Sequence, residues 1–165
     1  MKRLFFILAA ALVVASCGIY SFTGTSIQPD VQTITIPYVE NKAPRINPSL
    51  SNDLTEALQE KFRKLTRLEQ VDLDGDLELV CEITGYDVRA TSVTAEEQAA
   101  QNRLTVQVKI EFTNRKYPED DVTNTFNAYE DFDATLSLDA VESGLCESIV
   151  EKLVEDIFNA TVAQW

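Results

Sequence analysis

The chain has 165 residues, with 14 Lys and Arg against 27 Asp and Glu, which gives a formal net charge of −13 at pH 7. Such a surface repels polyanions, so nucleic-acid binding, which needs clustered Lys and Arg, is excluded. The chain contains no histidine, which excludes histidine-based catalytic triads, imidazole acid–base catalysis and zinc sites with histidine ligands.

Residues 1–16 have the layout of a secretory signal peptide. Lys2 and Arg3 form a positive n-region, residues 4–14 are mostly apolar, and small or modest side chains precede Cys17. The apolar stretch is shorter than the roughly 20 residues that a transmembrane helix needs. Removal of this segment leaves 12 basic and 27 acidic residues, a net charge of −15.

The segment Val14-Ala15-Ser16-Cys17 resembles the bacterial lipobox. The resemblance implies that the Cys17 thiol receives a diacylglyceryl group and that an acylated Cys17 becomes the first residue after cleavage. One acyl chain binds a membrane only marginally, whereas two or three hold a protein firmly. Gly18 in place of aspartate favours the outer membrane, by analogy with enteric sorting rules. The alternative is a plain exported protein with an incidental cysteine.

The first part of the mature chain predicts a tether, a strand and a helix. Residues 17–30 form the lipidated tether, which is rich in Ser, Thr and Gly. Val31 to Pro37 alternates apolar and polar residues and predicts a strand that the proline ends. Asn47 suits a helix cap, and apolar residues three and four apart predict a helix from about Pro48 to Thr66.

Basic residues gather at the end of this predicted helix, where cations complement the helix dipole. They are Lys61, Arg63, Lys64 and Arg67. A basic binding patch is the alternative interpretation of the same cluster.

The segment from Asp72 to Asp76 has acidic residues that alternate around a glycine, as in part of a calcium loop. An EF-hand needs a longer series of ligands, closed by a glutamate and flanked by helices. Here an alternating apolar segment follows instead. We therefore interpret Asp72 to Asp76 as a turn, with metal binding as the alternative.

Strands dominate the second half of the chain. One begins at Leu77, and a change of parity at Gly85 indicates a bulge or twist. A polar loop covers residues 90–101. The clearest strand then runs from Leu104 to Thr113, with one buried and one solvated face.

A hairpin turn from Asn114 to Asp121 leads to the last predicted strand, Thr123 to Ala134. Glu130 falls on the apolar side of that strand, so the pattern does not fix its register. A long amphipathic helix closes the chain from about Leu138 to Ala163.

This order predicts a two-layer α+β sandwich within residues 31–165. Two helices pack on one face of a four-stranded, mostly antiparallel sheet, and a mixed sheet is the alternative because a strand followed by a helix usually crosses to a parallel neighbour. Cys81 and Cys146 are expected to be buried as small apolar residues, with a disulfide as the alternative.

Three features together resemble the lipopolysaccharide (LPS)-assembly lipoproteins of the LptE family, in the version found in Bacteroidetes-like bacteria. They are the lipobox followed by Cys-Gly-Ile-Tyr-Ser-Phe, the strand that begins at Val31, and the helix start Asn-Pro-Ser-Leu-Ser-Asn-Asp-Leu-Thr-Glu-Ala-Leu. The element order and the length fit along the whole mature chain.

The resemblance implies a non-enzymatic outer-membrane lipoprotein on the periplasmic side, without a cofactor or a metal. Such proteins sit in the lumen of the LptD-like β-barrel of the LPS translocon, plug it and assist its assembly. A plug needs a rigid fold with a polar exterior that matches the polar lumen. An accessory lipoprotein of another envelope transport or secretion system is the alternative, and a carboxylate-based hydrolase is a third hypothesis, which needs two acids that converge in a cleft.

Members of the family are also reported to bind LPS through basic residues on the sheet and its loops. The acidic chain departs from that pattern, and lipid A phosphates would need a local basic patch. The candidates near the central hairpin are Arg103, Lys109, Arg115 and Lys116.

Overall fold

The structure, a computed structural model, describes residues 27–91 and 100–163. The predicted signal peptide, Cys17 and most of the predicted tether lie outside the described residues. So does most of the polar loop predicted after residue 90.

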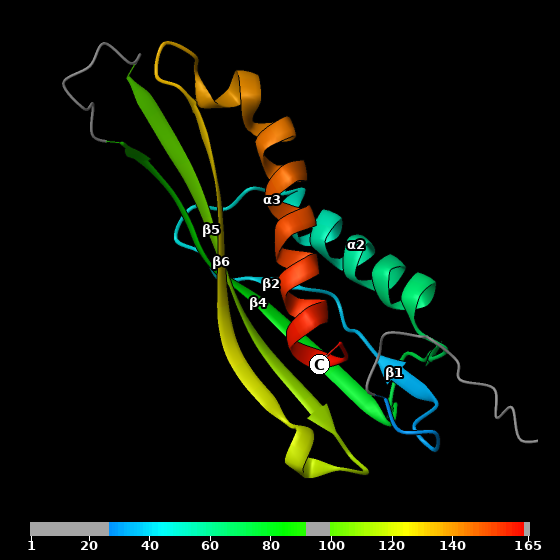
Figure 1. Ribbon diagram of the computed structural model, residues 1–165. Helices are drawn as coiled ribbons and strands as arrows, with labels where there is room; N and C mark the ends of the chain where they lie inside the picture. Colours follow the sequence, from blue (N-terminus) through cyan, green and yellow to red (C-terminus); the bar gives the residue numbers. More distant parts are fainter. Residues whose placement is uncertain (1–26, 92–99, 164–165) are drawn as a thin grey trace, which may run out of the picture.

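Six strands and two helices follow one another within the described residues (Figure 1). The short strands are β1 (Thr33–Thr35), β2 (Glu40–Asn41) and β3 (Glu69–Gln70), and the long ones are β4 (Leu77–Ala90), β5 (Gln101–Asn114) and β6 (Val122–Asp133). The helices are α2 (Leu50–Leu65) and α3 (Leu138–Thr161), and a 3-10 helix, η1 (Pro118–Asp120), lies between β5 and β6.

The strands form one mixed sheet in the order β3-β1-β4-β5-β6, with β2 also paired to β4. The three long strands are antiparallel to one another, whereas β1 runs parallel to β3 and β4, and β2 runs parallel to β4. The α+β class and the mostly antiparallel sheet are confirmed, but the prediction of four strands is wrong. Strands β2 and β3 have two residues each, too few to show a period of two.

The core lies between the sheet and the two helices, which cover the same face of the sheet (Figure 1). The register aligns the buried residues of β4 and β5, as in the pairs Leu79–Phe112 and Cys81–Ile110. The helices meet through an edge-to-face contact between Phe62 and Phe158, with ring centroids 5.1 Å apart. Burial of these apolar faces is the main force that holds the two layers together.

The Asn47 side chain, which the sequence indicated as the cap, bonds to the start of α2, although Ser49 occupies the N-cap position. The Asn47 Oδ1 accepts hydrogen bonds from the backbone N–H groups of Ser49 and Leu50, at 2.9 and 3.3 Å. The helix itself begins at Leu50 rather than at Pro48.

Glu130 belongs to the inner face of β6, opposite Leu104. Its carboxylate accepts a hydrogen bond from the Ser148 hydroxyl and forms an ion pair with Lys152 at 2.8 Å, and both partners lie on α3. The acid interrupts the apolar pattern because it bonds to the helix instead of entering the core.

Cys81 and Cys146 are free and buried, so the prediction of two buried small side chains is confirmed and the disulfide alternative is wrong. Burial raises the pKa of the Cys81 thiol to about 12.

Candidate functional site

The turn from Asp72 to Asp76 brings the start of β4 against β1. Asp74 adopts a left-handed backbone with φ 56°, and the Gly75 N–H donates to Thr35 Oγ1 at 3.0 Å. A Cβ on Gly75 would lie 2.7 Å from the Thr35 backbone nitrogen, so only glycine fits this contact. The turn interpretation of the sequence is therefore correct, and the close approach explains the glycine.

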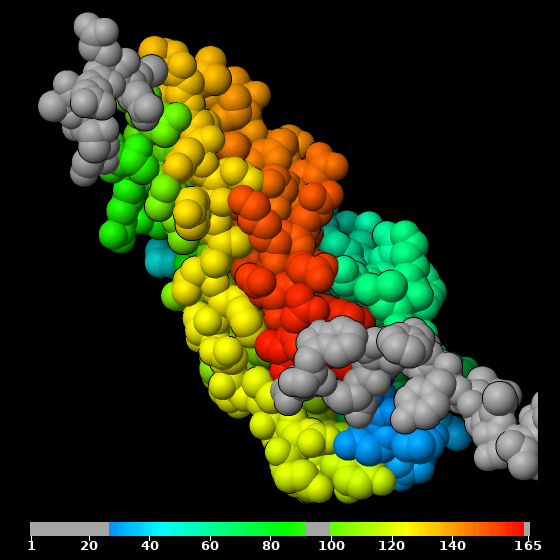
Figure 2. Space-filling view, in the orientation of Figure 1, coloured from blue at the N-terminus to red at the C-terminus, as the bar shows by residue number. Residues whose placement is uncertain are grey.

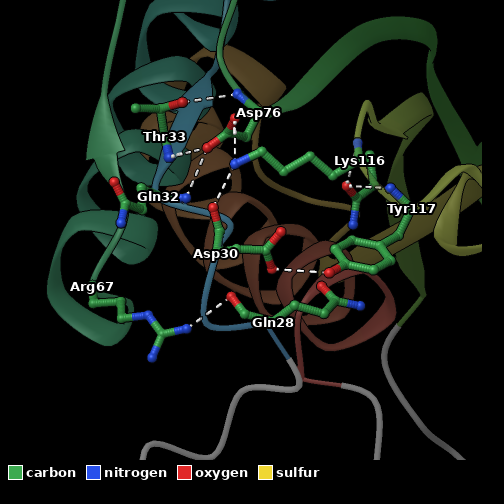
Figure 3. Close-up of polar contacts among 9 residues, drawn as sticks. Gln28, Asp30, Gln32, Thr33, Arg67, Asp76, Lys116 and Tyr117 are labelled. Atoms are coloured by element: carbon green, nitrogen blue, oxygen red, sulfur yellow. Dashed lines mark hydrogen bonds and ion pairs between the residues drawn. The ribbon is translucent and has the colours of Figure 1, made fainter.

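Asp76 fastens the residues at the start of β1 to the sheet (Figure 3). Its Oδ2 accepts hydrogen bonds from the backbone N–H groups of Gln32 at 2.8 Å and Thr33 at 3.2 Å. Its Oδ1 forms an ion pair with Lys116 at 3.0 Å, and its own N–H donates to Thr33 Oγ1 at 2.8 Å. These backbone hydrogen bonds and the Lys116 cation lower the pKa of Asp76 to about 2.

The same network holds the residues that precede β1. The Tyr117 hydroxyl donates to Asp30 Oδ1 at 3.0 Å, and the Lys116 ammonium donates to the Asp30 carbonyl. The hydrogen bond from Tyr117 to Asp30 raises the pKa of the phenol. The Arg67 guanidinium, just past α2, donates to the Gln28 carbonyl at 2.8 Å.

We call this group of residues the clamp: Gln28, Asp30, Arg67, Asp76, Lys116 and Tyr117 (Figure 3). It joins the first described residues of the chain to the end of α2, to the start of β4 and to the turn between β5 and β6. The charged groups of the clamp hold the fold together, because each carboxylate or cation in it bonds to a partner inside the same network.

The four predicted basic candidates do not form one patch. Arg103 and Lys109 lie six residues apart along β5, which separates them by about 20 Å, and Arg115 follows just past the end of the strand. Only Arg115 and Lys116 are neighbours, at the turn between β5 and β6.

Each candidate is already paired with an acid. Arg103 forms a bidentate pair with Asp131, at 2.7 and 2.9 Å, and its guanidinium lies 3.8 Å above the Tyr129 ring. The other three pairs are Lys109 with Glu111 at 2.6 Å, Arg115 with Asp74 at 2.9 Å and Lys116 with Asp76 at 3.0 Å. A role of these residues in LPS contact stays a prediction.

The sheet face opposite the helices is polar along β4, β5 and β6. Around Gly85 it is hollowed, where the Gln107 amide donates to Asn127 Oδ1 at 2.9 Å. The register between β4 and β5 shifts between Ile83 and Gly85, as the change of parity predicted.

Two further observations bear on the predicted site classes. Within residues 27–91 and 100–163, no group of three or more Cys, Asp or Glu side chains could hold a metal ion. In the same part of the chain, no helix has the length and apolar character that crossing a membrane requires.

Sequence reasoning missed the clamp. Asp76 and Gln32 are 44 residues apart, and nothing in either segment indicates the other. The one usable signal was the Asp-Gly turn, which marks a place where the backbone approaches a neighbour closely.

Comparison with known proteins identifies one family. The model of the LptE family, described as lipopolysaccharide-assembly, matches residues 31–161. A comparison with curated proteins found no match.

Similar solved structures include a minor lipoprotein from Acinetobacter baumannii, with 13% identity and a TM-score of 0.50 over 77% of this chain and 89% of that one. A protein from Chlamydia trachomatis has 6% identity and a TM-score of 0.53 over 79% and 97% of the two chains. A neuraminyllactose-binding hemagglutinin homolog from Helicobacter pylori has 12% identity and a TM-score of 0.52 over 84% and 87%. At these identities the likeness concerns the fold alone.

Proposed function

Because the chain belongs to the LptE family of lipopolysaccharide-assembly proteins, we propose that it is a lipoprotein subunit of the outer-membrane LPS translocon. In this role it plugs the LptD-like β-barrel and assists the assembly of that barrel, and it performs no catalysis. The observation that carries the proposal is the family match over residues 31–161, which include every strand and both helices that the structure describes.

Attachment to the membrane is part of the proposal. The signal peptide is cut before Cys17, the cysteine is acylated, palmitate being one such acyl group, and the chain is held on the periplasmic side of the outer membrane. Ile27 lies ten positions after Cys17, so the chain between them spans at most about 35 Å when fully extended. The clamp supports this arrangement, because it fixes the residues that follow the tether against the body of the fold.

The polar sheet face supports the plug role. Its charged side chains are largely paired, as Arg103 is with Asp131 and Lys109 with Glu111, and a polar exterior suits the lumen of a barrel. The proposal assigns the contact with the barrel to such polar surfaces, since the basic candidates for LPS contact are engaged with acids.

Affinity purification of the full chain from gently solubilised outer membranes tests the role. The expected result is co-purification with a large β-barrel protein of the LPS translocon. Recovery of a different transport or secretion partner would favour the accessory-lipoprotein alternative, and recovery with no barrel at all would refute the proposal.

The anchor has its own test. Mass analysis of the native product is expected to find residue 17 acylated and residues 1–16 absent. The variant Cys17→Ala is expected to be lost from the outer membrane while the fold is retained. A native product with a bare thiol at Cys17 would refute the attachment without bearing on the fold.

A further inference from the structure

Strand β6 ends the sheet and has a free edge. Within residues 27–91 and 100–163, its 12 residues pair with β5 on one side only. The pairing runs without a register shift from Val122 opposite Phe112 to Asp133 opposite Gln101. An unpaired edge of this length presents a row of backbone donors and acceptors to which another strand can add.

The hydrogen bonds show which backbone groups of β6 point away from β5. The Lys152 ammonium donates to the Tyr129 carbonyl at 3.1 Å from the side of α3, whereas the Ala134 N–H points inward to the Ala100 carbonyl at 2.9 Å. Since directions alternate in an antiparallel pair, the odd-numbered residues face outward. These are Thr123, Thr125, Asn127, Tyr129, Asp131 and Asp133.

Few of these outward groups are occupied. The Thr125 N–H bonds to Asn124 Oδ1 at 2.8 Å, and Lys152 takes the Tyr129 carbonyl. The backbone groups of Asn127 and Asp131 meet no hydrogen-bond partner within the part of the chain that the structure describes. The Asp133 carbonyl accepts from the Leu136 N–H at 3.0 Å. Among the described residues, the outward edge is therefore blocked at three atoms and open over most of its length.

The groove beside this edge has an acidic wall. It runs between residues 127–129 of β6 and the flank of α3 (Figure 2). Helix α3 carries six acidic residues and one lysine. Among the described residues, Glu151 and Asp156 of this wall form no ion pair, whereas Glu155 is paired with Lys61.

We propose that the free edge of β6 docks an extended segment of another protein, which adds to the sheet as a further strand and carries basic side chains at alternate positions. Backbone hydrogen bonds to the outward groups of β6 supply the pairing, and Glu151 and Asp156 select the basic side chains. A second copy of this chain is the wrong partner, because two acidic walls on chains of net charge −13 would repel each other.

The experiment uses the full chain in a neutral detergent and a ten-residue synthetic peptide of alternating Lys and Val. Hydrogen exchange is measured at single amides. Binding is expected to protect the Asn127, Tyr129 and Asp131 amides, which point outward. A control peptide of the same sequence, N-methylated at alternate residues, keeps the charge but cannot pair and is expected to give no protection.

Two variants distinguish the contribution of backbone pairing to binding from that of the acidic side chains. Asn127→Pro removes an outward N–H and keeps the backbone hydrogen bonds to β5, losing only the side-chain bond from Gln107. It is expected to abolish binding. The double variant Glu151→Lys with Asp156→Lys is expected to lower the affinity roughly tenfold. The matched control is Glu147→Lys, an exposed acid of α3 that faces α2, with less than a roughly twofold effect.

Three results would overturn the inference. The first is the absence of protection at these amides, and the second is equal binding of the N-methylated peptide. The third is a concentration-dependent dimer of the chain that Asn127→Pro abolishes. None of them bears on co-purification with the β-barrel, so this inference and the proposed function can fail separately.

Discussion

The substitution Asp76→Asn tests whether the clamp contributes to stability. It keeps the shape of the side chain but removes the charge that holds the N–H groups of Gln32 and Thr33 and the Lys116 ammonium. The Asp76 side chain is 22% exposed. We expect the variant to fold and to unfold at a lower denaturant concentration.

The size of the expected loss of stability follows from the pKa of Asp76, which the fold lowers from 3.8 to about 2. At about 1.4 kcal/mol for each tenfold change, this corresponds to about 2.5 kcal/mol. Partial exposure reduces the expected loss in Asp76→Asn to about 2 kcal/mol at pH 7.

The pH dependence gives a second, independent check. A carboxylate with a lowered pKa stabilises the fold at every pH above its unfolded value of 3.8, and that stabilisation is lost as the pH falls through about 2. The difference in free energy of unfolding between the native chain and Asp76→Asn is therefore full at pH 7 and mostly gone at pH 2.

The assay is urea unfolding of both chains across this pH range. The control is Glu119→Gln, an exposed acid of η1 in the turn between β5 and β6, which is expected to change stability by less than about 0.5 kcal/mol. Equal stability of Asp76→Asn and the native chain at pH 7, or a deficit that persists unchanged at pH 2, would refute the assignment.

Four further predictions concern the body of the fold. Gly75→Ala is expected to destabilise by about 3 kcal/mol in denaturant unfolding, because its Cβ meets backbone atoms of Ile34, Thr35 and Leu77. Gly144→Ala, whose Cβ meets nothing within 4 Å in α3, should stabilise by about 0.5–1 kcal/mol. Leu104→Ala removes a fully buried side chain and should destabilise by about 2–5 kcal/mol, whereas Leu73→Ala, at 79% exposure, should change little. At pH 8 a thiol reagent should label Cys81 and Cys146 at least about 100-fold more slowly in the native chain than in urea, because both are buried and burial raises the Cys81 pKa.

The long elements could be predicted from the sequence because their burial is periodic. In β5 the alternate residues from Leu104 to Phe112 are all buried, and the apolar stripe of α3 lies against the sheet, as its spacing indicated. The bulge at Gly85 was also visible, as a change of parity.

The short parallel strands could not be predicted, because long-range contacts define them. The strand predicted from Val31 to Pro37 shrinks to Thr33–Thr35. The N–H groups of Gln32 and Thr33 bond to the Asp76 side chain instead of to a neighbouring strand, and Pro37 has no N–H to offer.

The charged residues were the hardest to interpret from the sequence. Arg103, Lys109, Arg115 and Lys116 stood out as a basic group in an acidic chain. Arg103, Arg115 and Lys116 each pair with an acid across a strand or a turn, and such partners become visible only when the register is known. Lys109 pairs with Glu111, two residues further along the same strand.

The clamp and the free edge of β6 are joined by the turn between β5 and β6. Lys116 and Tyr117, which hold Asp30, lie in the turn that leads directly into Val122, the first residue of β6. A segment docked on β6 would therefore lie in a fixed direction relative to the point where the tether joins the fold. In the part of the chain that the structure describes, the outward backbone groups of β6 hydrogen-bond to no clamp residue, so Asp76→Asn should lower stability while leaving the affinity for the basic peptide unchanged. A loss of peptide binding in that variant, measured where it is fully folded, would show that the clamp also shapes the edge.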